Sequence, residues 1–465
     1  MRRLVLCAAV AASLALAPAA SAASTFFISG AGYGHGIGMS QYGASGYALH
    51  GNDYRFILAH YYQGTTLGTT DPDQIIRVLI STGRASFSGA TAAGGKKLTA
   101  GQTYSVRVLG DGNLGLYSQA GKKLGEFQSL LRATGPGPLQ LAGSGTYRGA
   151  FEFRPVGGAV QTVDAVRLDD YVRGVVSAEM PSSWSFEALK AQAVAARTYA
   201  ITSNVRGNGF QLYSDTRSQA YGGVAAEGPQ TNAAVAATRG QIVTDAGIPV
   251  PTLFFSSSGG YTEDIQNVWL GSAPDSWLRG VPDPYDDSNA NPYYRWSERL
   301  TMPAAARDLG SLVKGNLIGV KVTKQGVSPR VISAVVVGTR GQRSVTGPQL
   351  QNIFGLRSTY MMFSSISSAA GPPSTSGGQA LGGAFMPRVE HTIAVLFDAH
   401  TEIHGNVFPA PAGAPLAVQQ RAASRWRTIG QTRLGADGAF STRVPHAGSY
   451  RIVYHGVPGP AVRVG

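Results

Sequence analysis

The sequence predicts an α+β fold, with a β-rich core that carries one prominent Ala-rich helix and an all-β, sandwich-like module at the C-terminus. The length of 465 residues predicts several domains. Only 14% of the residues are charged, whereas 43% are hydrophobic and 61 are glycine, which is typical of a turn-rich β protein with sizeable cores. One stretch alone, residues 185–202, has the composition of a long helix.

Residues 1–22 are typical of a secretory signal peptide. Two arginines precede an apolar run over 4–17, and Ala20-Ser21-Ala22 fits a small-residue cleavage site. The alternative is an uncleaved membrane anchor, which is disfavoured because the run is short for a membrane span. We therefore expect a secreted protein that has no integral membrane span after cleavage.

The net charge limits the classes of binding partner that we expect, and the cysteine content limits the kinds of site. Loss of Arg2 and Arg3 with the signal peptide lowers the formal net charge from +13 to +11, which suits an anionic surface such as a bacterial cell wall. Nucleic acid is disfavoured, because the chain is exported and has no dense Lys/Arg run with interleaved aromatic residues. Cys7, the only cysteine, leaves with the signal peptide, so that we expect neither a disulfide nor a thiolate metal site.

Residues 23–70 and 71–160 differ in pattern. The first segment is Gly-rich and then helical: a loop over 34–41 leads into a helix through His50, and residues 54–62 place apolar side chains at helical spacing. Residues 71–160 predict a β-rich subdomain, because short β-prone stretches alternate with Gly, Asp and Asn. The clearest strands are expected at 75–80, 104–109 and 150–153.

Residues 161–363 are predicted to form the catalytic core around the long helix. Ser185 is placed to cap this helix, and Glu187 lies in its first turn, where the helix dipole favours an acid. A hairpin is expected further along, with its turn at Ala246-Gly247.

The end of the core and the C-terminal module are also readable from the sequence. A strand is expected at 332–337, and Gly347-Pro348 opens a short helix. Residues 364–385 have the Ser/Gly/Pro composition of a flexible linker, and 386–465 are predicted to form the sandwich-like module. Its strands are expected at 392–397, 416–420, 426–429, 440–444 and 450–454.

The segment 171–184 is the most informative for chemistry. An apolar strand is predicted to end at Glu179, whose sequence neighbours include Val175, Val176 and Met180. Such surroundings raise the pKa of a carboxyl group and let it hold a proton near neutral pH, as a general acid must. The alternatives are a surface glutamate at a strand end and a structural pair with arginine, and composition alone favours them.

Three further segments have the chemistry of a sugar subsite. Residues 214–223 combine hydroxyl, amide and aromatic groups, and residues 254–264 run from a strand into a Ser/Gly-rich turn whose N–H groups are suited to face a ligand. Residues 283–286 read Asp-Pro-Tyr-Asp. Taken singly, each is more simply interpreted as an ordinary turn with local Asx or Ser/Thr bonding.

Taken together, these segments resemble the SpoIID/LytB family. The motif Ser-Ala-Glu-Met-Pro-Ser-Ser-Trp at 177–184 continues into the helix, and the segments at 218–221, 255–260, 283–286 and 356–359 match later family motifs in order. The resemblance covers roughly residues 72–363. Members are bacterial cell-wall proteins, and the stage II sporulation member is a lytic transglycosylase that cuts peptidoglycan glycan strands after the stem peptides are removed.

The resemblance implies a mechanism in which one carboxyl group, that of Glu179, acts twice. It protonates the glycosidic oxygen between N-acetylmuramic acid and N-acetylglucosamine, then takes a proton from the muramic C6 hydroxyl as a 1,6-anhydro ring closes. A second carboxylate, from Asp215, Glu263 or Asp286, would instead give two-carboxylate hydrolysis. The LytB member is described as an amidase enhancer. A non-catalytic wall protein that enhances an N-acetylmuramoyl-L-alanine amidase is therefore the alternative, and a carbohydrate-binding adhesin is the third.

The sequence departs from the family pattern in two places. The Gly-His-Gly-x-Gly-Met-Ser-Gln motif, which usually ends the family domain, begins at Gly34, as in a circular permutation. We therefore expect the segment around 34–44 to pack against the chain near Phe363. Some relatives carry Cys/His zinc ligands, which this sequence lacks, so that no metal and no cofactor is expected.

The expected partners are peptidoglycan glycan strands and, among proteins, an amidase or another wall enzyme. Glu179 is the predicted catalytic residue. The predicted substrate-binding residues are His35, Gln41, Lys190, Gln192, Arg197, Asp215, Ser218, Gln219, Tyr221, Ser257 and Ser258.

Overall fold

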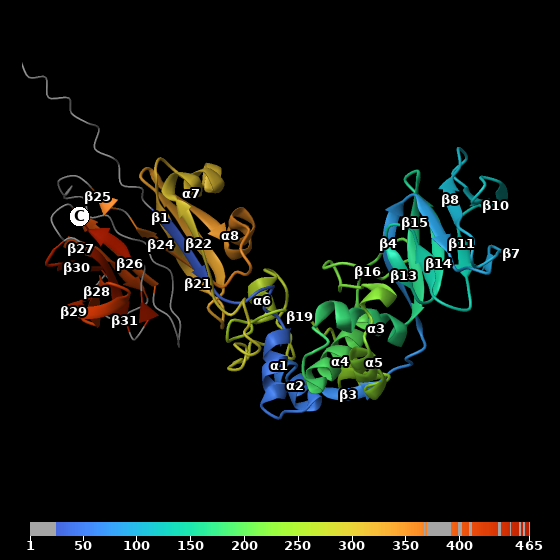
Figure 1. Cartoon of the computed structure of the whole chain (residues 1–465), viewed down its shortest axis with the longest axis horizontal. Helices are drawn as coiled ribbons and strands as arrows, with labels where there is room; N and C mark the ends of the chain where they lie inside the picture. The colour runs from blue at the N-terminus through green and yellow to red at the C-terminus, as the bar shows by residue number, and fades with distance from the viewer. Residues whose placement is uncertain are drawn as a thin grey trace, which may run out of the picture.

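The computed structural model of the chain describes residues 25–366, 368–369, 392–398, 402–408, 412–435, 439–446, 448–454, 457–458 and 461–464. The predicted signal peptide, Cys7 and most of the predicted linker lie outside the described residues. Strands outnumber helices in the described chain, which confirms the predicted α+β, β-rich fold (Figure 1). Within these ranges no helix is both long and apolar enough to cross a membrane.

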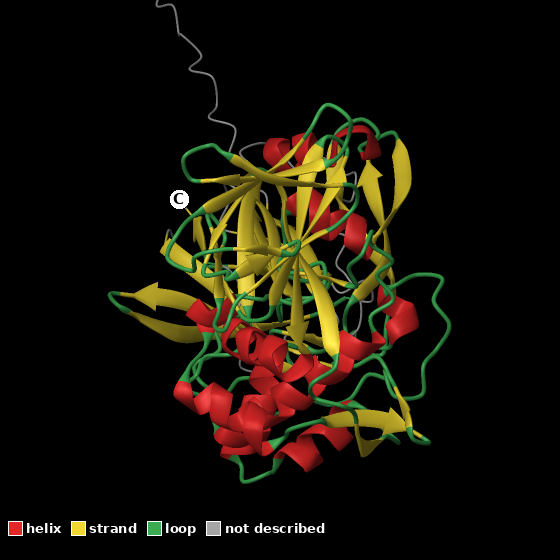
Figure 2. Cartoon of the chain, turned by 90° about the vertical axis from the view of Figure 1, so that its right-hand side faces the viewer, coloured by secondary structure: helices red, strands yellow, loops and turns green. Residues whose placement is uncertain are grey.

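A group of helices lies between the β-rich parts of the chain (Figure 1). In the view of Figure 2, which is turned by 90°, these helices lie below most of the strands. The Ala-rich helix α4 lies at the centre of the group and contacts all its other members. Its alanines are buried, and their small side chains let neighbouring helices approach closely. The group comprises α1 (Gln41–Leu49), α2 (Tyr54–Tyr61), α3 (Leu168–Glu179), α4 (Phe186–Thr202) and α5 (Pro229–Ala237).

Two sheets form a β-rich lobe beyond the helices. One has the strand order β16-β4-β15-β14-β11-β6-β7 and the other β10-β9-β8-β5-β12-β13. Their faces meet at aromatic residues: the rings of Phe87 and Phe153, from different sheets, have centroids 5.1 Å apart. The strands are β4 (Ile75–Gly83), β5 (Ala85–Ser88), β6 (Ala92–Ala93), β7 (Lys96–Lys97), β8 (Tyr104–Val108), β9 (Leu114–Ser118), β10 (Lys123–Phe127), β11 (Leu131–Thr134), β12 (Leu139–Leu141), β13 (Gly145–Tyr147), β14 (Ala150–Val156), β15 (Ala159–Arg167) and β16 (Leu212–Tyr213).

A third lobe joins the two ends of residues 25–366. Strand β1 (Thr25–Gly30) pairs antiparallel with both β20 (Trp296–Thr301) and β24 (Met361–Ile366), so that Ile28 lies opposite Phe363. Closer to the predicted segment, the Gly34 N–H donates to the Arg357 carbonyl at 3.0 Å, whereas the permutation itself stays a prediction. The lobe also contains α7 (Met302–Leu309), β21 (Leu317–Gln325), β22 (Val331–Gly338), β23 (Gly341–Thr346) and α8 (Gly347–Phe354).

Several short connections link these parts. Strand β3 (Thr66–Thr69) pairs with β17 (Gln241–Asp245), which also forms the predicted hairpin with β18 (Ile248–Pro249). Strand β2 (Met39–Ser40) pairs parallel with β19 (Phe254–Phe255), which brings the start of α1 beside the Ser/Gly-rich turn.

The C-terminal residues form two further sheets, with the orders β25-β26-β27-β30 and β29-β28-β31-β32. Their buried side chains, such as those of Ile403, Leu416 and Tyr450, form a separate cluster. The strands are β25 (Ser368–Ala369), β26 (Thr392–Asp398), β27 (Glu402–Phe408), β28 (Pro415–Ala422), β29 (Arg425–Arg433), β30 (Ala439–Arg443), β31 (Gly448–Tyr454) and β32 (Val457–Pro458).

One predicted element is wrong. The apolar strand expected to end at Glu179 is the helix α3. Its buried residues Tyr171, Val172, Val175 and Val176 recur at helical spacing and face the core, so that periodicity outweighs the β propensity of valine. A smaller difference concerns Ser185, which occupies the N-cap position of α4 but makes no capping hydrogen bond with its side chain.

Candidate active site

Glu179 is the last residue of α3, and its half-buried side chain is held by two distant segments. The main-chain N–H of Ala220 donates to Glu179 Oε1 at 2.7 Å, and the Gln41 amide donates to Oε2 at 3.2 Å. Each carboxyl oxygen therefore has its own donor. The site unites the N-terminal segment, the end of α3 and the loop after β16.

The surroundings of Glu179 favour its protonated form. Burial raises the pKa of this carboxyl group, whereas the hydrogen bonds from Ala220 and Gln41 lower it and only partly offset the burial. The negative end of the α3 dipole acts in the same direction as burial. The charge of Glu179 in turn contributes to the raised pKa of Tyr171 and Tyr199. A raised pKa is the direction of shift that a general acid requires.

The position of Gln41 follows from how α1 begins. Ser40 is the N-cap of α1, and its hydroxyl accepts from the Gly43 N–H while donating to Asp286 Oδ1 at 2.7 Å. Gly43 allows the close approach, because a Cβ there would lie 2.1 Å from Tyr61 Oη. Gln41, the first helical residue, is thereby fixed against Glu179.

The loop that presents the Ala220 N–H is fixed by two predicted substrate-binding residues. Gln219 is buried and accepts from the Tyr171 hydroxyl at 2.9 Å, and the Tyr221 hydroxyl donates to Asp164 at 2.8 Å. Ser218, at the start of this turn, accepts from the Tyr213 N–H. These side chains position the loop from within the protein.

The α4 residues predicted to bind substrate are also turned inward. Arg197 is fully buried, forms an ion pair with Asp169 at 2.6 Å and donates to main-chain oxygens. Lys190 pairs with Glu187 at 2.5 Å. Gln192 is fully buried, and neither of its amide atoms has a hydrogen-bond partner among the described residues.

The Ser/Gly-rich turn serves an internal carboxylate. The Ser257 hydroxyl and the Ser258 and Gly259 N–H groups donate to Asp286 at 2.7, 3.1 and 2.8 Å. The groups expected to face a ligand therefore face Asp286. Burial and the neighbouring Asp286 raise the pKa of Asp283 to about 8.

His35 lies apart from the Glu179 hydrogen bonds. Its ring is within hydrogen-bond distance of the Phe254 carbonyl at 3.1 Å and accepts from the Ile37 N–H at 3.0 Å. Burial, assisted by the positive charge of Arg330, lowers the pKa of His35 to about 4. In the N-terminal motif, Gln41 is therefore the residue that touches Glu179.

The three candidate second carboxylates are engaged elsewhere. Asp215 is exposed and forms an ion pair with Arg217 at 2.7 Å. Glu263 is buried and accepts from the Ser328 N–H at 3.1 Å, and Asp286 is occupied as described above. Within the described ranges no three His, Cys, Asp or Glu side chains are grouped so as to hold a metal ion.

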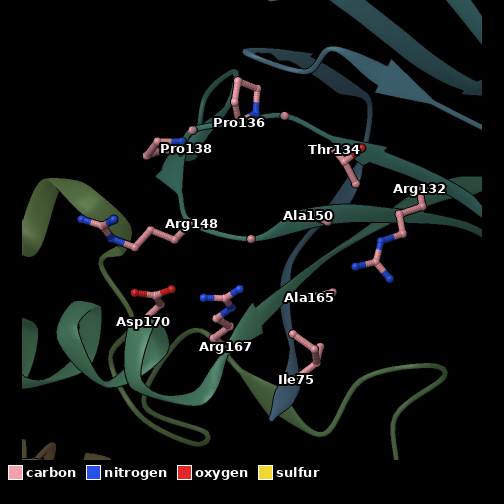
Figure 3. Close-up of a pocket in the computed structure, with 13 residues that line it drawn as sticks. Ile75, Arg132, Thr134, Pro136, Pro138, Arg148, Ala150, Ala165, Arg167 and Asp170 are labelled. Carbon is pink, nitrogen blue, oxygen red and sulfur yellow. The ribbon is translucent and has the colours of Figure 1, made fainter. Parts of the chain in front are cut away.

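A cavity of about 400 Å³ lies near the opposite end of α3 from Glu179 (Figure 3). Arg132, Arg148, Arg167 and Asp170 line it, and Arg148 is held by Glu227 through two hydrogen bonds of 2.6 and 2.9 Å. None of the residues predicted to bind substrate lines this cavity.

Sequence reasoning missed the Ala220 N–H and the tyrosines Tyr171 and Tyr199. A main-chain donor carries no residue signature, so that only the fold reveals it. The tyrosines lie in the motif-bearing helices, and an aromatic residue two turns before Glu179 was an available signal.

The helical core resembles a domain of the SpoIID/LytB family. The family model described as Stage II sporulation protein matches residues 156–244, a stretch that contains Glu179 and the whole of α4. This match confirms the family resemblance.

Named relatives support the same assignment. The chain is 32% identical over 217 residues to Stage II sporulation protein D of Bacillus subtilis (strain 168), covering 43% of this chain and 61% of the relative. It is 30% identical over 214 residues to the protein of that name from Bacillus amyloliquefaciens, covering 42% and 60%. It is also 45% identical over 103 residues to the Amidase enhancer of Bacillus subtilis (strain 168), covering 22% and 14%. The chain thus spans about three fifths of the length of the first two relatives.

Proposed function

We propose that this protein is a secreted cell-wall enzyme that cleaves peptidoglycan glycan strands by lytic transglycosylation. The observation that carries the proposal is the half-buried Glu179 carboxyl group, whose raised pKa suits a general acid and which two donors orient. The family resemblance and relatives named for sporulation support a role related to sporulation and the cell wall.

The two donors suit a carboxyl group that works in both protonation states. The Ala220 N–H belongs to the main chain and stays on Oε1, which leaves Oε2 to carry the transferable proton. The Gln41 amide faces Oε2 and can present either its NH2 group to the carboxylate or, after rotation, its carbonyl to the acid. Glu179 would protonate the glycosidic oxygen and then accept the C6 hydroxyl proton as the 1,6-anhydro ring closes.

The positions of the other acidic residues favour a mechanism with one catalytic carboxyl group over a mechanism with two. Hydrolytic glycosidases need a second carboxyl group across the scissile bond. Asp215, Glu263 and Asp286 each have hydrogen-bond donors elsewhere in the protein. The C6 hydroxyl of the substrate then replaces water as the nucleophile.

The test is digestion of purified glycan strands lacking stem peptides, with products identified by mass spectrometry. We expect 1,6-anhydromuramic ends, and a rate roughly 10²–10⁴-fold lower for Glu179→Gln, the loss typical of removing a general acid–base. Reducing ends would identify a hydrolase, and unchanged activity of Glu179→Gln would refute the assignment.

The second candidate is a non-catalytic enhancer of an amidase, favoured by the 45% identity to a protein named Amidase enhancer. In that case the wild type would release no glycan fragments but would accelerate a separate N-acetylmuramoyl-L-alanine amidase. Glu179→Gln would then stimulate the amidase as well as the wild type does. The two candidates therefore give opposite results for the same variant.

A further inference from the structure

A row of four aromatic side chains leads away from the Glu179 site; we call Trp184, Tyr42, Tyr293 and Tyr33 the aromatic row. The ring centroids of Trp184 and Tyr42 are 4.8 Å apart, those of Tyr42 and Tyr293 are 6.1 Å apart, and those of Tyr293 and Tyr33 are 4.9 Å apart. The four residues come from three distant parts of the sequence. Their succession is therefore a product of the fold.

The aromatic row lies at the protein surface. Trp184, Tyr42 and Tyr293 are partly exposed, and Tyr33, at the far end, is 44% exposed. Aromatic residues that only fill cores here, such as Phe151, are fully buried. Tyr and Trp side chains combine an apolar ring with a polar tip, which matches sugars, because sugars present apolar C–H faces edged by hydroxyl groups.

The aromatic row begins with residues that are close in sequence to the Glu179 site. Tyr42 directly follows Gln41, whose amide contacts the Glu179 carboxyl group. Trp184 lies in the short turn between α3 and α4 that Glu179 begins. A chain bound with one glycosidic bond at Glu179 would therefore meet Trp184 and Tyr42 first and Tyr33 last.

We propose that the aromatic row is a glycan-binding platform on which successive sugar rings of an extended β-linked strand stack. Successive rings are inclined to one another by 63°, 76° and 53°, so that each offers the strand an apolar surface with a different direction. This inference rests on the proposed function, and it assigns the glycan-length preference of the Glu179 site to a surface that ends at Tyr33.

The buried Asp286 holds the platform together. Ser40, two residues before Tyr42, donates to it, and so does Ser257, which forms a β-bridge with Tyr33. Asn291, two residues before Tyr293, donates to the Asp286 carbonyl at 2.6 Å. The carboxylate and the main-chain carbonyl of Asp286 thus hold three residues that lie next to the tyrosines of the aromatic row. The Ser/Gly-rich turn therefore has a scaffolding role.

The test is glycan binding by the full chain in a Glu179→Gln background, in which turnover is expected to be slow. Titration calorimetry would use stem-free glycan oligomers of increasing length. We expect Tyr33→Ala to leave the affinity for the shortest oligomers unchanged and to weaken the longest roughly fivefold to tenfold, the effect of losing one apolar stacking surface. Trp184→Ala should weaken binding at all lengths.

Two control variants separate stacking from general damage. Tyr33→Phe keeps the ring and should keep the affinity, and Phe56→Ala removes an aromatic side chain of similar exposure (48%) from α2, outside the row, and should change nothing. Equal weakening by Phe56→Ala, or a Tyr33→Ala effect that does not depend on length, would overturn the proposal. If the wild type does not cleave glycan but Tyr33→Ala still weakens the affinity for long oligomers only, the proposed enzyme activity would be refuted and the proposed platform would be supported. Cleavage by the wild type with no effect of the row variants would refute the platform alone.

Discussion

Glu179 and Asp286 are both held by the start of α1, through the adjacent residues Gln41 and Ser40, yet their surroundings differ. Glu179 is half-buried and accepts one hydrogen bond at each oxygen, whereas Asp286 is fully buried and accepts from two serine hydroxyls and two main-chain N–H groups. A buried carboxyl group surrounded by donors is a structural centre. One with few donors and partial exposure can exchange a proton.

The largest expected effect is a difference in the free energy of unfolding between two variants, Asp286→Ala and Glu179→Gln. Removing Asp286 leaves several buried donors without an acceptor, at about 1–3 kcal/mol each, so that the free energy of unfolding should fall by at least about 3 kcal/mol. Glu179→Gln should change it by less than about 1 kcal/mol. Urea denaturation measures both. Comparable losses in the two variants would abolish the contrast between a structural and a catalytic carboxyl group.

A smaller effect is expected where the two regions meet, at Gly43. Alanine normally stabilises a helix interior relative to glycine. At Gly43, however, its Cβ would lie 2.1 Å from Tyr61 Oη and 2.3 Å from the Asp283 carboxyl oxygens. We expect Gly43→Ala to lower the free energy of unfolding by about 1–3 kcal/mol. Gly101→Ala is the matched control, because its added Cβ has no atom within 4 Å, and a loss of similar size there would contradict the crowding argument.

The pH dependence of activity sharpens the role of Gln41. Cleavage requires protonated Glu179, so that the rate should fall as the pH rises through the pKa of this group. Gln41 donates to the charged form and lowers that pKa, so that Gln41→Ala should shift the alkaline limb to higher pH. A pH–rate profile measures the shift. Gln74→Ala, which removes an amide that hydrogen-bonds Thr70, should leave the limb in place.

The smallest expected effect is on how the free energy of unfolding depends on pH. Burial raises the pKa of Glu179 in the folded state, so that the folded chain binds this proton more tightly than the unfolded chain. The stability of the wild type relative to Glu179→Gln should therefore increase as the pH falls through the raised pKa, and decrease as the pH rises. Thermal unfolding of both proteins across this range measures the difference, and parallel curves would contradict a raised pKa.

Much of the fold could be predicted from the sequence, because secondary structure follows local patterns. The strands at 75–80, 104–109 and 150–153, the helix at 185–202 and the hairpin turn at Ala246-Gly247 all formed as expected. The segment that ends at Glu179 is a helix although its valines favour a strand, because its buried residues recur at helical spacing.

The sequence by itself determined the candidate acid and its apolar setting, since the residues around Glu179 are its chain neighbours. Only the tertiary structure decided the partners of the polar motifs: Gln41 and Ala220 meet at Glu179, whereas Ser257 and Ser258 turn to Asp286. The physical reason is that a buried polar group must be satisfied, and its partners are whichever donors the packed chain brings within reach. Local pattern selects the residue types, but long-range packing selects the contacts.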